Sequence, residues 1–376
     1  MTVIEPTSLA LTDLQAIHTN LERIRAHVGE RKVLAAVKAN AYGHGAVAVS
    51  RMIQQTQAAD WLGVATVSEG LELRDAGITL PILKLSMTRH PDETTAAVAA
   101  AITVAVTDTT SIMAVAAAAT AAGVVADVHL KIDTGMGRIG CRPEEAVKLA
   151  ALIDESPALT LGGAFSHLPA SDDPGQDAAT AAQITLFRDT VAAIETARGP
   201  IPLKHLANSG AVLGHPDAWL DLVRPGIIIY GAYPDPAAPR TIPLEPALEW
   251  STYLSFVKRV TAGTTISYGR TWTAPRDTVI GTIPIGYADG YSRLLSNRGR
   301  VLVGGRSCPI VGRICMDQAM VDLGPDATDK VGDEVVLVGR DESEEITTTE
   351  VAALMGTIPY EMTCLIAPRV TRQYLD

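Results

Sequence analysis

Residues 33–45 place an amine at the end of an apolar run. Small and β-branched residues before Lys38 predict a buried strand, and Gly43 and Gly45 after it predict a tight turn that also carries Tyr42. Burying an ammonium group is costly unless it is paired. Burial also lowers the pKa of a lysine and leaves the nucleophilic amine that Schiff-base chemistry requires. The segment therefore predicts either a reactive lysine or a structural one that reaches back to solvent.

Residues 128–140 carry a second set of polar groups. A predicted strand with Lys131 runs into Arg138, which Gly135 and Gly137 precede. Glycines allow a backbone to approach a ligand closely, and a guanidinium offers a rigid fork of donors to a carboxylate or a phenolate. The alternative is a surface arginine in a glycine-rich loop.

Further short motifs combine a polar group with a predicted strand end or turn. They contain His167, Asn208, Ser209, Arg224 with Gly226 and Ile227, Tyr268, Met316 and Tyr360. A short hydroxyl with free backbone N–H groups, as at Ser209, is a reasonable phosphate contact. For each motif taken alone the alternative is an ordinary turn or a structural side chain, and a lone histidine such as His167 is more often structural than catalytic.

Together these motifs resemble those of alanine racemases, and the resemblance runs through nearly the whole chain. It implies pyridoxal 5'-phosphate as the cofactor, held by Lys38, which is also one of two catalytic acid–bases. It makes Arg138 a contact for the substrate carboxylate and the cofactor ring hydroxyl. It makes Lys131 a residue that is often carbamylated, so that its negative charge orients Arg138.

The resemblance also assigns the remaining contacts with the cofactor. Arg224 would face the pyridine nitrogen, where a guanidinium leaves that nitrogen an acceptor and so restrains side reactions such as transamination. His167 would lie beside the ring and link the catalytic tyrosine to Arg224. The phosphate would be held by Tyr42, Asn208, Ser209, Gly226, Ile227 and Tyr360.

Racemisation needs a proton removed from one face of Cα and another delivered to the opposite face. Two acid–bases on opposite faces are the simplest solution, and each must work near its pKa. The resemblance makes Tyr268 the second acid–base and the Met316 backbone N–H a contact for the substrate carboxylate. It places Tyr268 in the neighbouring subunit's site, which implies a homodimer with a shared active site.

Alanine is thus the expected small-molecule substrate, and D-alanine for peptidoglycan the expected product. Three alternatives remain. One is a racemase of broader amino-acid specificity. Another is an amino-acid decarboxylase on a similar barrel, which would need a glutamate at the ring nitrogen in place of Arg224. The third is a non-catalytic carrier of pyridoxal phosphate.

The elements that must position these residues are predicted by eight apolar segments with helical sequence mostly between them. They span residues 33–40, 61–67, 81–86, 102–107, 125–133, 159–167, 203–209 and 223–230. This order is typical of a parallel (β/α)₈ (TIM) barrel, whose reactive residues gather at the C-terminal strand ends. A doubly wound sheet is the alternative, but no Gly-x-Gly-x-x-Gly motif follows the first strand.

After residue 234 five prolines mark a linker, and short β-rich segments follow it. We therefore predict an α/β barrel at 12–238 and a mostly-β C-terminal domain at 239–376, with residues 1–11 added to it. Thr12 and Gln15 predict a helix start, as do Thr347 and Glu350. The last predicted strand spans residues 364–370.

Composition excludes several classes of protein. A formal net charge of −11 argues against nucleic acid and anionic membranes as partners. None of the four cysteines forms a Cys-x-x-Cys pair, so no metal is expected. The N-terminal residues carry no secretion signal and no apolar run reaches membrane-spanning length, which favours the cytoplasm.

Overall fold

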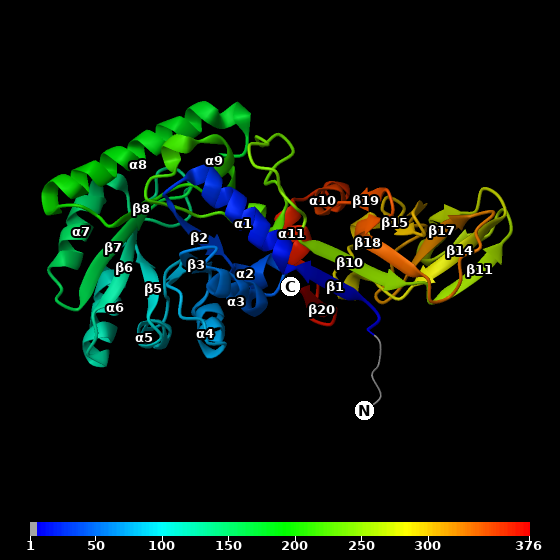
Figure 1. Cartoon of the computed structure of the whole chain (residues 1–376), viewed down its shortest axis with the longest axis horizontal. Helices are drawn as coiled ribbons and strands as arrows, with labels where there is room; N and C mark the ends of the chain where they lie inside the picture. Colours follow the sequence, from blue (N-terminus) through cyan, green and yellow to red (C-terminus); the bar gives the residue numbers. More distant parts are fainter. Residues whose placement is uncertain (1–5) are drawn as a thin grey trace.

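The computed structural model describes residues 6–376, and its N-terminal part is a near-closed barrel of eight parallel strands (Figure 1). The strands pair in the order β8-β7-β6-β5-β4-β3-β2-β9. Their bounds are β2 (Lys32–Ala36), β3 (Trp61–Val64), β4 (Ile82–Lys84), β5 (Ile102–Val106), β6 (Ala126–Lys131), β7 (Leu159–Phe165), β8 (Leu203–His205) and β9 (Leu222–Val223). Between β8 and β9, Asp221 N–H donates to Lys204 O at 3.1 Å. The barrel prediction is confirmed.

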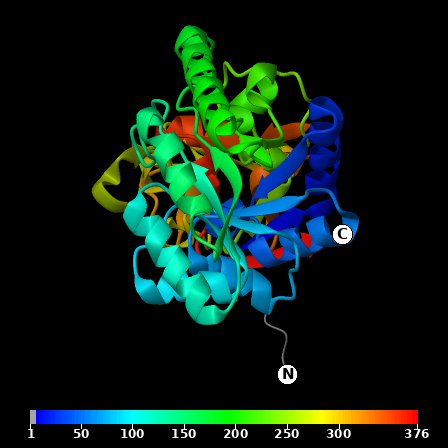
Figure 2. The same cartoon turned by 90° about the vertical axis from the view of Figure 1, so that its left-hand side faces the viewer.

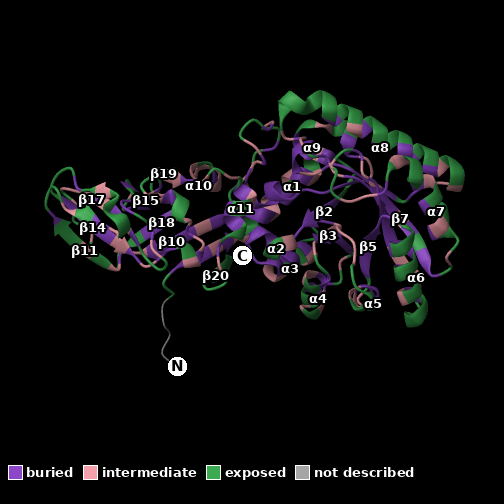
Figure 3. Cartoon of the chain, turned by 180° about the vertical axis from the view of Figure 1, so that it is seen from behind, coloured by how far each residue is buried: buried purple, intermediate pink, exposed green. Residues whose placement is uncertain are grey.

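Helices surround this barrel, as Figure 2 shows with the barrel turned towards the viewer. They are α1 (Leu14–Val28), α3 (Ala46–Thr56), α4 (Val67–Asp75), α5 (Pro91–Ala99), α6 (Thr109–Ala122), α7 (Ala146–Asp154), α8 (Asp177–Arg198) and the short α9 (Ser209–Gly214). Side-chain caps set several starts: Thr66 and Glu69 form a capping box on α4. Helices with one apolar face bury it on the strands and leave the other in water, as the exposed outer side of α8 shows in Figure 3.

The C-terminal part is mostly β-structure, as predicted. Its larger sheet has the order β16-β15-β18-β10-β1-β20, and β11-β14-β17 form a second sheet. The elements are β1 (Leu9–Asp13), β10 (Leu248–Tyr253), β11 (Phe256–Val260), β12 (Thr265–Ile266), β13 (Trp272–Thr273), β14 (Thr278–Ile283), β15 (Arg300–Val303), β16 (Arg306–Pro309), β17 (Ala319–Gly324), β18 (Glu334–Asp341), β19 (Glu344–Ile346), α10 (Thr348–Met355), α11 (Pro359–Cys364) and β20 (Thr371–Leu375).

Several predicted elements differ from the structure. The first and seventh barrel strands are shorter than predicted, because β2 ends at Ala36 and β8 at His205. Thr12 lies in β1, and Asp13, not Thr12, caps α1 by accepting the Ala16 N–H at 2.8 Å. The eighth barrel strand ends after Val223, because Pro225 cannot donate to a strand ladder. The final strand begins only after residue 370, at the start of β20, whereas residues up to Cys364 form α11. The start of α10 is as predicted, with Thr347 capping it.

The division at 12–238 and 239–376 stays a proposal. β1 pairs with β10 and β20 and so carries residues 9–13 into the C-terminal sheet. The remaining part of the 1–11 assignment, residues 1–5, lies outside the described residues. Within residues 6–376, every helix is too short or too polar to cross a membrane.

Candidate active site

A cavity of about 320 Å³ lies at the C-terminal ends of the barrel strands. It brings together ten of the residues predicted from the sequence: Lys38, Tyr42, Lys131, Arg138, His167, Asn208, Ser209, Arg224, Gly226 and Tyr360. Ile227, Tyr268 and Met316 do not line it. Arg224 follows β9 directly, and Lys38 and His167 lie two residues beyond the ends of β2 and β7, which is where a barrel gathers its functional side chains.

Lys38 opens a segment with unusual backbone geometry, labelled α2 (Lys38–Tyr42) in Figure 1. The four residues Ala39 to Tyr42 have φ between 52° and 54°, the left-handed region. This conformation costs an L-residue about 1–2 kcal/mol. Tertiary contacts must therefore hold the segment in place, and strain of this kind is concentrated at functional sites.

Contacts from both parts of the chain hold this segment. Glu69 accepts the Ala39 N–H at 2.7 Å, and the Arg372 guanidinium donates to Gly43 O at 3.0 Å. A Cβ on Gly43 would lie 2.2 Å from Thr363 O, so only glycine fits against α11. The C-terminal elements α11 and β20 thus help to position Lys38.

The cavity is strongly cationic. Lys38, Lys131, Arg138 and Arg224 line it, and none of its lining residues in the described chain is Asp or Glu. Burial, and then Arg138, lower the pKa of Lys38. Burial, and then Arg224, lower the pKa of Lys131 to about 7 and that of His167 to about 2. Such a set of uncompensated cations is suited to an anionic ligand.

Arg224 is buried at the base of this cavity and held by three hydrogen bonds. Its Nη2 donates to Ser166 O at 2.7 Å and to Leu206 O at 3.1 Å, and its Nη1 donates to His205 Nδ1 at 3.0 Å. Burial lowers its pKa to about 9, so the guanidinium remains charged at neutral pH. A guanidinium has five N–H donors, so two remain for a ligand.

The histidine that contacts Arg224 is therefore His205, for which the sequence-based interpretation assigned no role. No hydrogen bond between Arg224 and His167 is found in the part of the chain that the structure describes. His205 is in turn 2.8 Å from His129. Both histidines lie inside apolar strands, and a polar residue within a predicted buried strand was the available signal.

The other end of the cavity presents neutral donors. Gly226 N–H donates to Ser209 Oγ at 2.8 Å. Burial raises the pKa of the Tyr42 and Tyr360 phenols, so both remain O–H donors. Ile227 begins a 3₁₀ turn (Ile227–Tyr230), and the N–H at such a start has no partner within the turn.

Asn208 differs from its neighbours because its side chain is already engaged. It accepts the Ala211 N–H at 3.1 Å and the Ser171 hydroxyl at 2.6 Å, and it donates to Leu168 O at 2.9 Å. We interpret Asn208 as the residue that positions the loop before Ser209.

Tyr268 and Met316 lie away from this cavity, on the surface of the C-terminal part. Tyr268 begins a short turn (Tyr268–Arg270), is 72% exposed and lines a separate hollow with Cys315 and Gln318. Met316 is 54% exposed. Within residues 6–376 of one chain, Tyr268, the predicted second acid–base, therefore does not line the cavity that contains Lys38.

The residues of the cavity fit pyridoxal 5'-phosphate. Ser209, the two tyrosines and the start of a 3₁₀ turn offer donors to a phosphate group, and Arg224 offers free N–H groups to a ring nitrogen. In other proteins this cofactor is held by a lysine amine, and Lys38 supplies such an amine here. Within residues 6–376 we find no group of three or more His, Cys, Asp or Glu side chains arranged to hold a metal ion.

Comparisons with known proteins agree with this assignment. The family model "Alanine racemase, N-terminal domain" matches residues 12–234, and "Alanine racemase, C-terminal domain" matches residues 247–374. An alanine racemase from Cutibacterium acnes is 53% identical over 368 residues, which are 98% of each chain.

Solved structures show the same likeness. Alanine racemase from D-cycloserine producing Streptomyces lavendulae has a TM-score of 0.93 and 38% identity, over 100% of this chain and 98% of that one. Alanine racemase from Bartonella henselae with covalently bound pyridoxal phosphate has a TM-score of 0.87 and 28% identity, over 99% and 100% of the two chains.

Proposed function

The chain belongs to the alanine racemase family, and we propose that it racemises alanine by a two-base mechanism with pyridoxal 5'-phosphate held in this cavity. One observation carries the proposal: four cationic side chains and no carboxylate line a pocket that begins at Lys38. A phosphate and a substrate carboxylate would supply the missing negative charge. The decarboxylase alternative lacks its glutamate at this position, and the match to both racemase domains disfavours a simple carrier.

When bound, the cofactor supplies an electron-withdrawing ring that makes the Cα–H of an attached amino acid acidic. Lys38 holds the cofactor and takes or returns a proton on one face of Cα. Burial, and then Arg138, lower its pKa, which favours the uncharged amine that can accept that proton. Arg224 would donate to the ring nitrogen and keep its own proton, because its guanidinium is still charged at neutral pH.

Arg138 binds the substrate carboxylate, and Lys131 controls the charge next to it. A lysine with a pKa of about 7 is largely unprotonated at slightly alkaline pH. Its amine can then add to carbon dioxide and release one proton, which gives a carbamate with one negative charge. We propose this modification because it would place an anion among Arg138, Arg224 and Lys38, the three cations that lower the pKa of Lys131.

The second acid–base is Tyr268 of a partner subunit. Its exposure, and that of Met316 near it in the C-terminal part, leave both free to enter the cavity of another chain. We therefore propose a homodimer with shared active sites, in which Met316 N–H contacts the substrate carboxylate. We place the enzyme in the cytoplasm, where its D-alanine would supply peptidoglycan synthesis.

The experiment that tests this function follows the α-hydrogen of alanine in deuterated water. In Tyr268→Phe, exchange from L-alanine should slow far more than exchange from D-alanine, because the face served by Lys38 is intact. Tyr253→Phe, on β10 and away from both hollows, is the matched control and should retain both rates. Equal slowing of both enantiomers in Tyr268→Phe would contradict the two-face assignment.

A further inference from the structure

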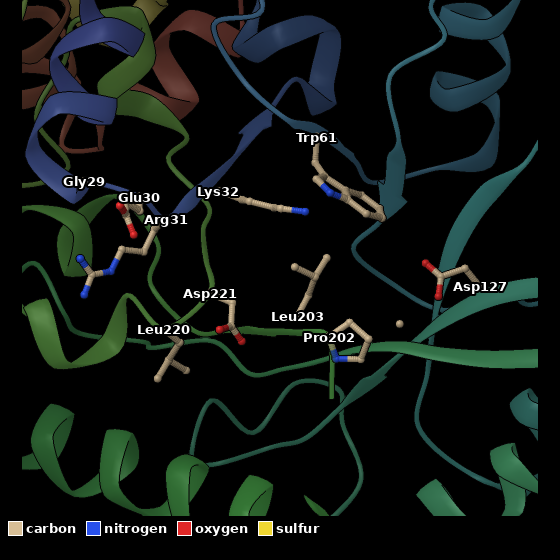
Figure 4. A pocket seen from close by; sticks show the side chains of 11 residues that line it. Gly29, Glu30, Arg31, Lys32, Trp61, Asp127, Pro202, Leu203, Leu220 and Asp221 are labelled. Atoms are coloured by element: carbon tan, nitrogen blue, oxygen red, sulfur yellow. The ribbon is translucent and has the colours of Figure 1, made fainter. Parts of the chain in front are cut away.

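A second cavity, of about 830 Å³, opens at the opposite end of the barrel (Figure 4). Lys32, Trp61 and Leu203, which line it, are the first residues of β2, β3 and β8. In a parallel barrel these N-terminal strand ends form the mouth that faces away from the active site. Asp127, near the start of β6, also lines it.

A row of four polar side chains leads from this mouth to the catalytic cavity. Asp127 Oδ2 lies 3.7 Å from His129 Nε2, which is too long for a hydrogen bond, and His129 Nε2 has no hydrogen-bond partner among the described residues. The link between these two groups is therefore electrostatic. His129 Nδ1 lies 2.8 Å from His205 Nε2. His205 Nδ1 accepts from Arg224 at 3.0 Å. Both histidines are fully buried, and Arg224 lines the catalytic cavity.

The proton positions along this row follow from the arginine. A guanidinium can only donate, so His205 Nδ1 must be the acceptor. Burial keeps His205 and His129 uncharged, because it lowers the pKa of each well below the ordinary value. Neutral His205 then carries its proton on Nε2 and donates it to His129 Nδ1. His129 must in turn carry its proton on Nε2, directed at Asp127.

We propose that Asp127, His129 and His205 are positioning residues that couple the charge of Asp127, at the outer mouth, to the hydrogen bond that Arg224 offers the cofactor ring. An ionised Asp127 attracts the His129 proton and makes each imidazole in turn a stronger acceptor. The guanidinium then gives more of its donor strength to His205 and less to the ring nitrogen. This inference rests on the proposed role of Arg224.

Two adjacent glycines of β7 provide the space for this row. A Cβ on Gly162 would lie 2.0 Å from Asp127 Oδ1, and a Cβ on Gly163 would lie 2.7 Å from the His129 ring. Thr103 donates to Asp127 Oδ2 at 3.2 Å and orients the carboxyl group. The glycines of β7 thus leave space for Asp127 and His129, and Thr103 of β5 holds the Asp127 carboxyl group.

The charge of Asp127 changes close to neutral pH. Burial raises its pKa to about 6, so the carboxyl is neutral below that pH and ionised above it. The titratable and charged groups that face the row are Glu30, Arg31, Lys32 and Asp221 around the outer mouth, with Arg224 and Lys131 at the inner end. Lys204 already pairs with Asp221 at 3.0 Å.

The test uses ¹⁵N NMR of histidine-labelled full-length protein with its cofactor, at pH values on both sides of about 6. His129 and His205 should both carry their proton on Nε2, and their ring shifts should follow the titration of Asp127. Asp127→Asn keeps the size of the side chain and an oxygen near His129 but has no titrating proton, so the pH dependence should be lost. The visible absorption band of the cofactor should lose the same pH dependence.

Glu30→Gln is the matched control, since it removes one negative charge from the same mouth without touching the row. It should leave the histidine titration unchanged. His129→Asn separates Asp127 from His205 and serves if Asp127→Asn fails to fold. A proton on His205 Nδ1, or a titration that persists in Asp127→Asn, would overturn the proposal. The NMR signals need no catalysis, so failure of the proposed function would leave them readable.

Discussion

Lys131 shows how the charge of one residue depends on its surroundings. It is 5% exposed, and its Nζ lies 4.3 Å from the centre of the Phe165 ring. Its charged neighbours are the cations Arg224, Arg138 and Lys38, with Asp133 as a weaker opposing charge. Without an anionic ligand or a carbamate, its positive charge meets mainly like charges. The buried positive charge of Lys131 therefore lowers the stability of the folded chain, while the same set of cations is suited to binding an anion.

Lys131→Met should therefore raise the free energy of unfolding, by an amount that depends on pH. The pKa of Lys131 in the folded chain, about 7, is below the ordinary 10.5, so the folded state binds fewer protons between these values and stability rises with pH across that window. Below pH 7 the methionine variant should therefore exceed wild type by more than ~1 kcal/mol in free energy of unfolding. The gain should shrink as pH rises towards 10.5.

Denaturant unfolding of cofactor-free protein in buffer free of carbon dioxide measures this difference. Lys148→Met, at an exposed lysine of α7, is the control and should show no comparable gain. A gain that stays constant across the pH range would mean that methionine only packs better than lysine there.

At the same scale, the sequence was sufficient for the residues that follow strands and insufficient for those inside them. Lys38 and Arg138 could be predicted to meet because a barrel brings strand ends to one face. The partner of Arg224 could not be predicted, since His167 lies just after β7 and His205 is the last residue of the neighbouring strand β8. Which of them contacts the guanidinium depends on the register of the strands, which short motifs do not encode.

The left-handed segment after β2 is the feature of the elements with the largest local cost. Its residues, from Ala39 to Tyr42, include no glycine. Hence no local signal predicted this conformation: the strand was expected to continue to residue 40, and a tight turn was expected at Tyr42. The contacts with Glu69 and Arg372, 30 and 329 residues away in the chain, hold it instead.

Ala39→Gly tests whether this segment is strained. Glycine adopts positive φ without the cost borne by alanine, although it loses more entropy on folding, so the free energy of unfolding should rise by roughly 0.5–1 kcal/mol. The Ala39 N–H bond to Glu69 is retained in the variant. Ala48→Gly, in the interior of α3, is the matched control and should lower stability by about 1 kcal/mol. A loss at both positions in denaturant unfolding would contradict the strain.

Elements with strong periodicity were predicted well, in contrast. The apolar strands β3 to β7 and the capped helix α10 lie close to their expected positions. The predicted eighth strand extends beyond β9 because Ile227 to Tyr230 are apolar, as in a strand. In the structure these residues instead form a 3₁₀ turn that begins after Gly226. Apolar composition alone does not separate these two conformations.

At the scale of the whole molecule, the described part of one chain does not bring all the predicted site residues together. The barrel cavity contains Lys38 and the anion-binding residues, whereas Tyr268 is 72% exposed on the other part and lines a different hollow. Other large apolar side chains of the C-terminal part, among them Met316, are also exposed. Exposed apolar groups of this kind are typical of surfaces that another chain covers.

Mixing two inactive variants tests whether the site is shared. In a dimer of one Lys38→Ala chain and one Tyr268→Phe chain, shared sites would comprise one site with both defects and one with none. Random exchange of equal amounts should then restore roughly a quarter of the wild-type racemase rate, because half of the dimers are mixed and half of their sites are intact. If each site used residues of one chain only, every site would keep one defect. No recovery after verified subunit exchange would therefore contradict sharing, and each variant unfolded and refolded alone is the control.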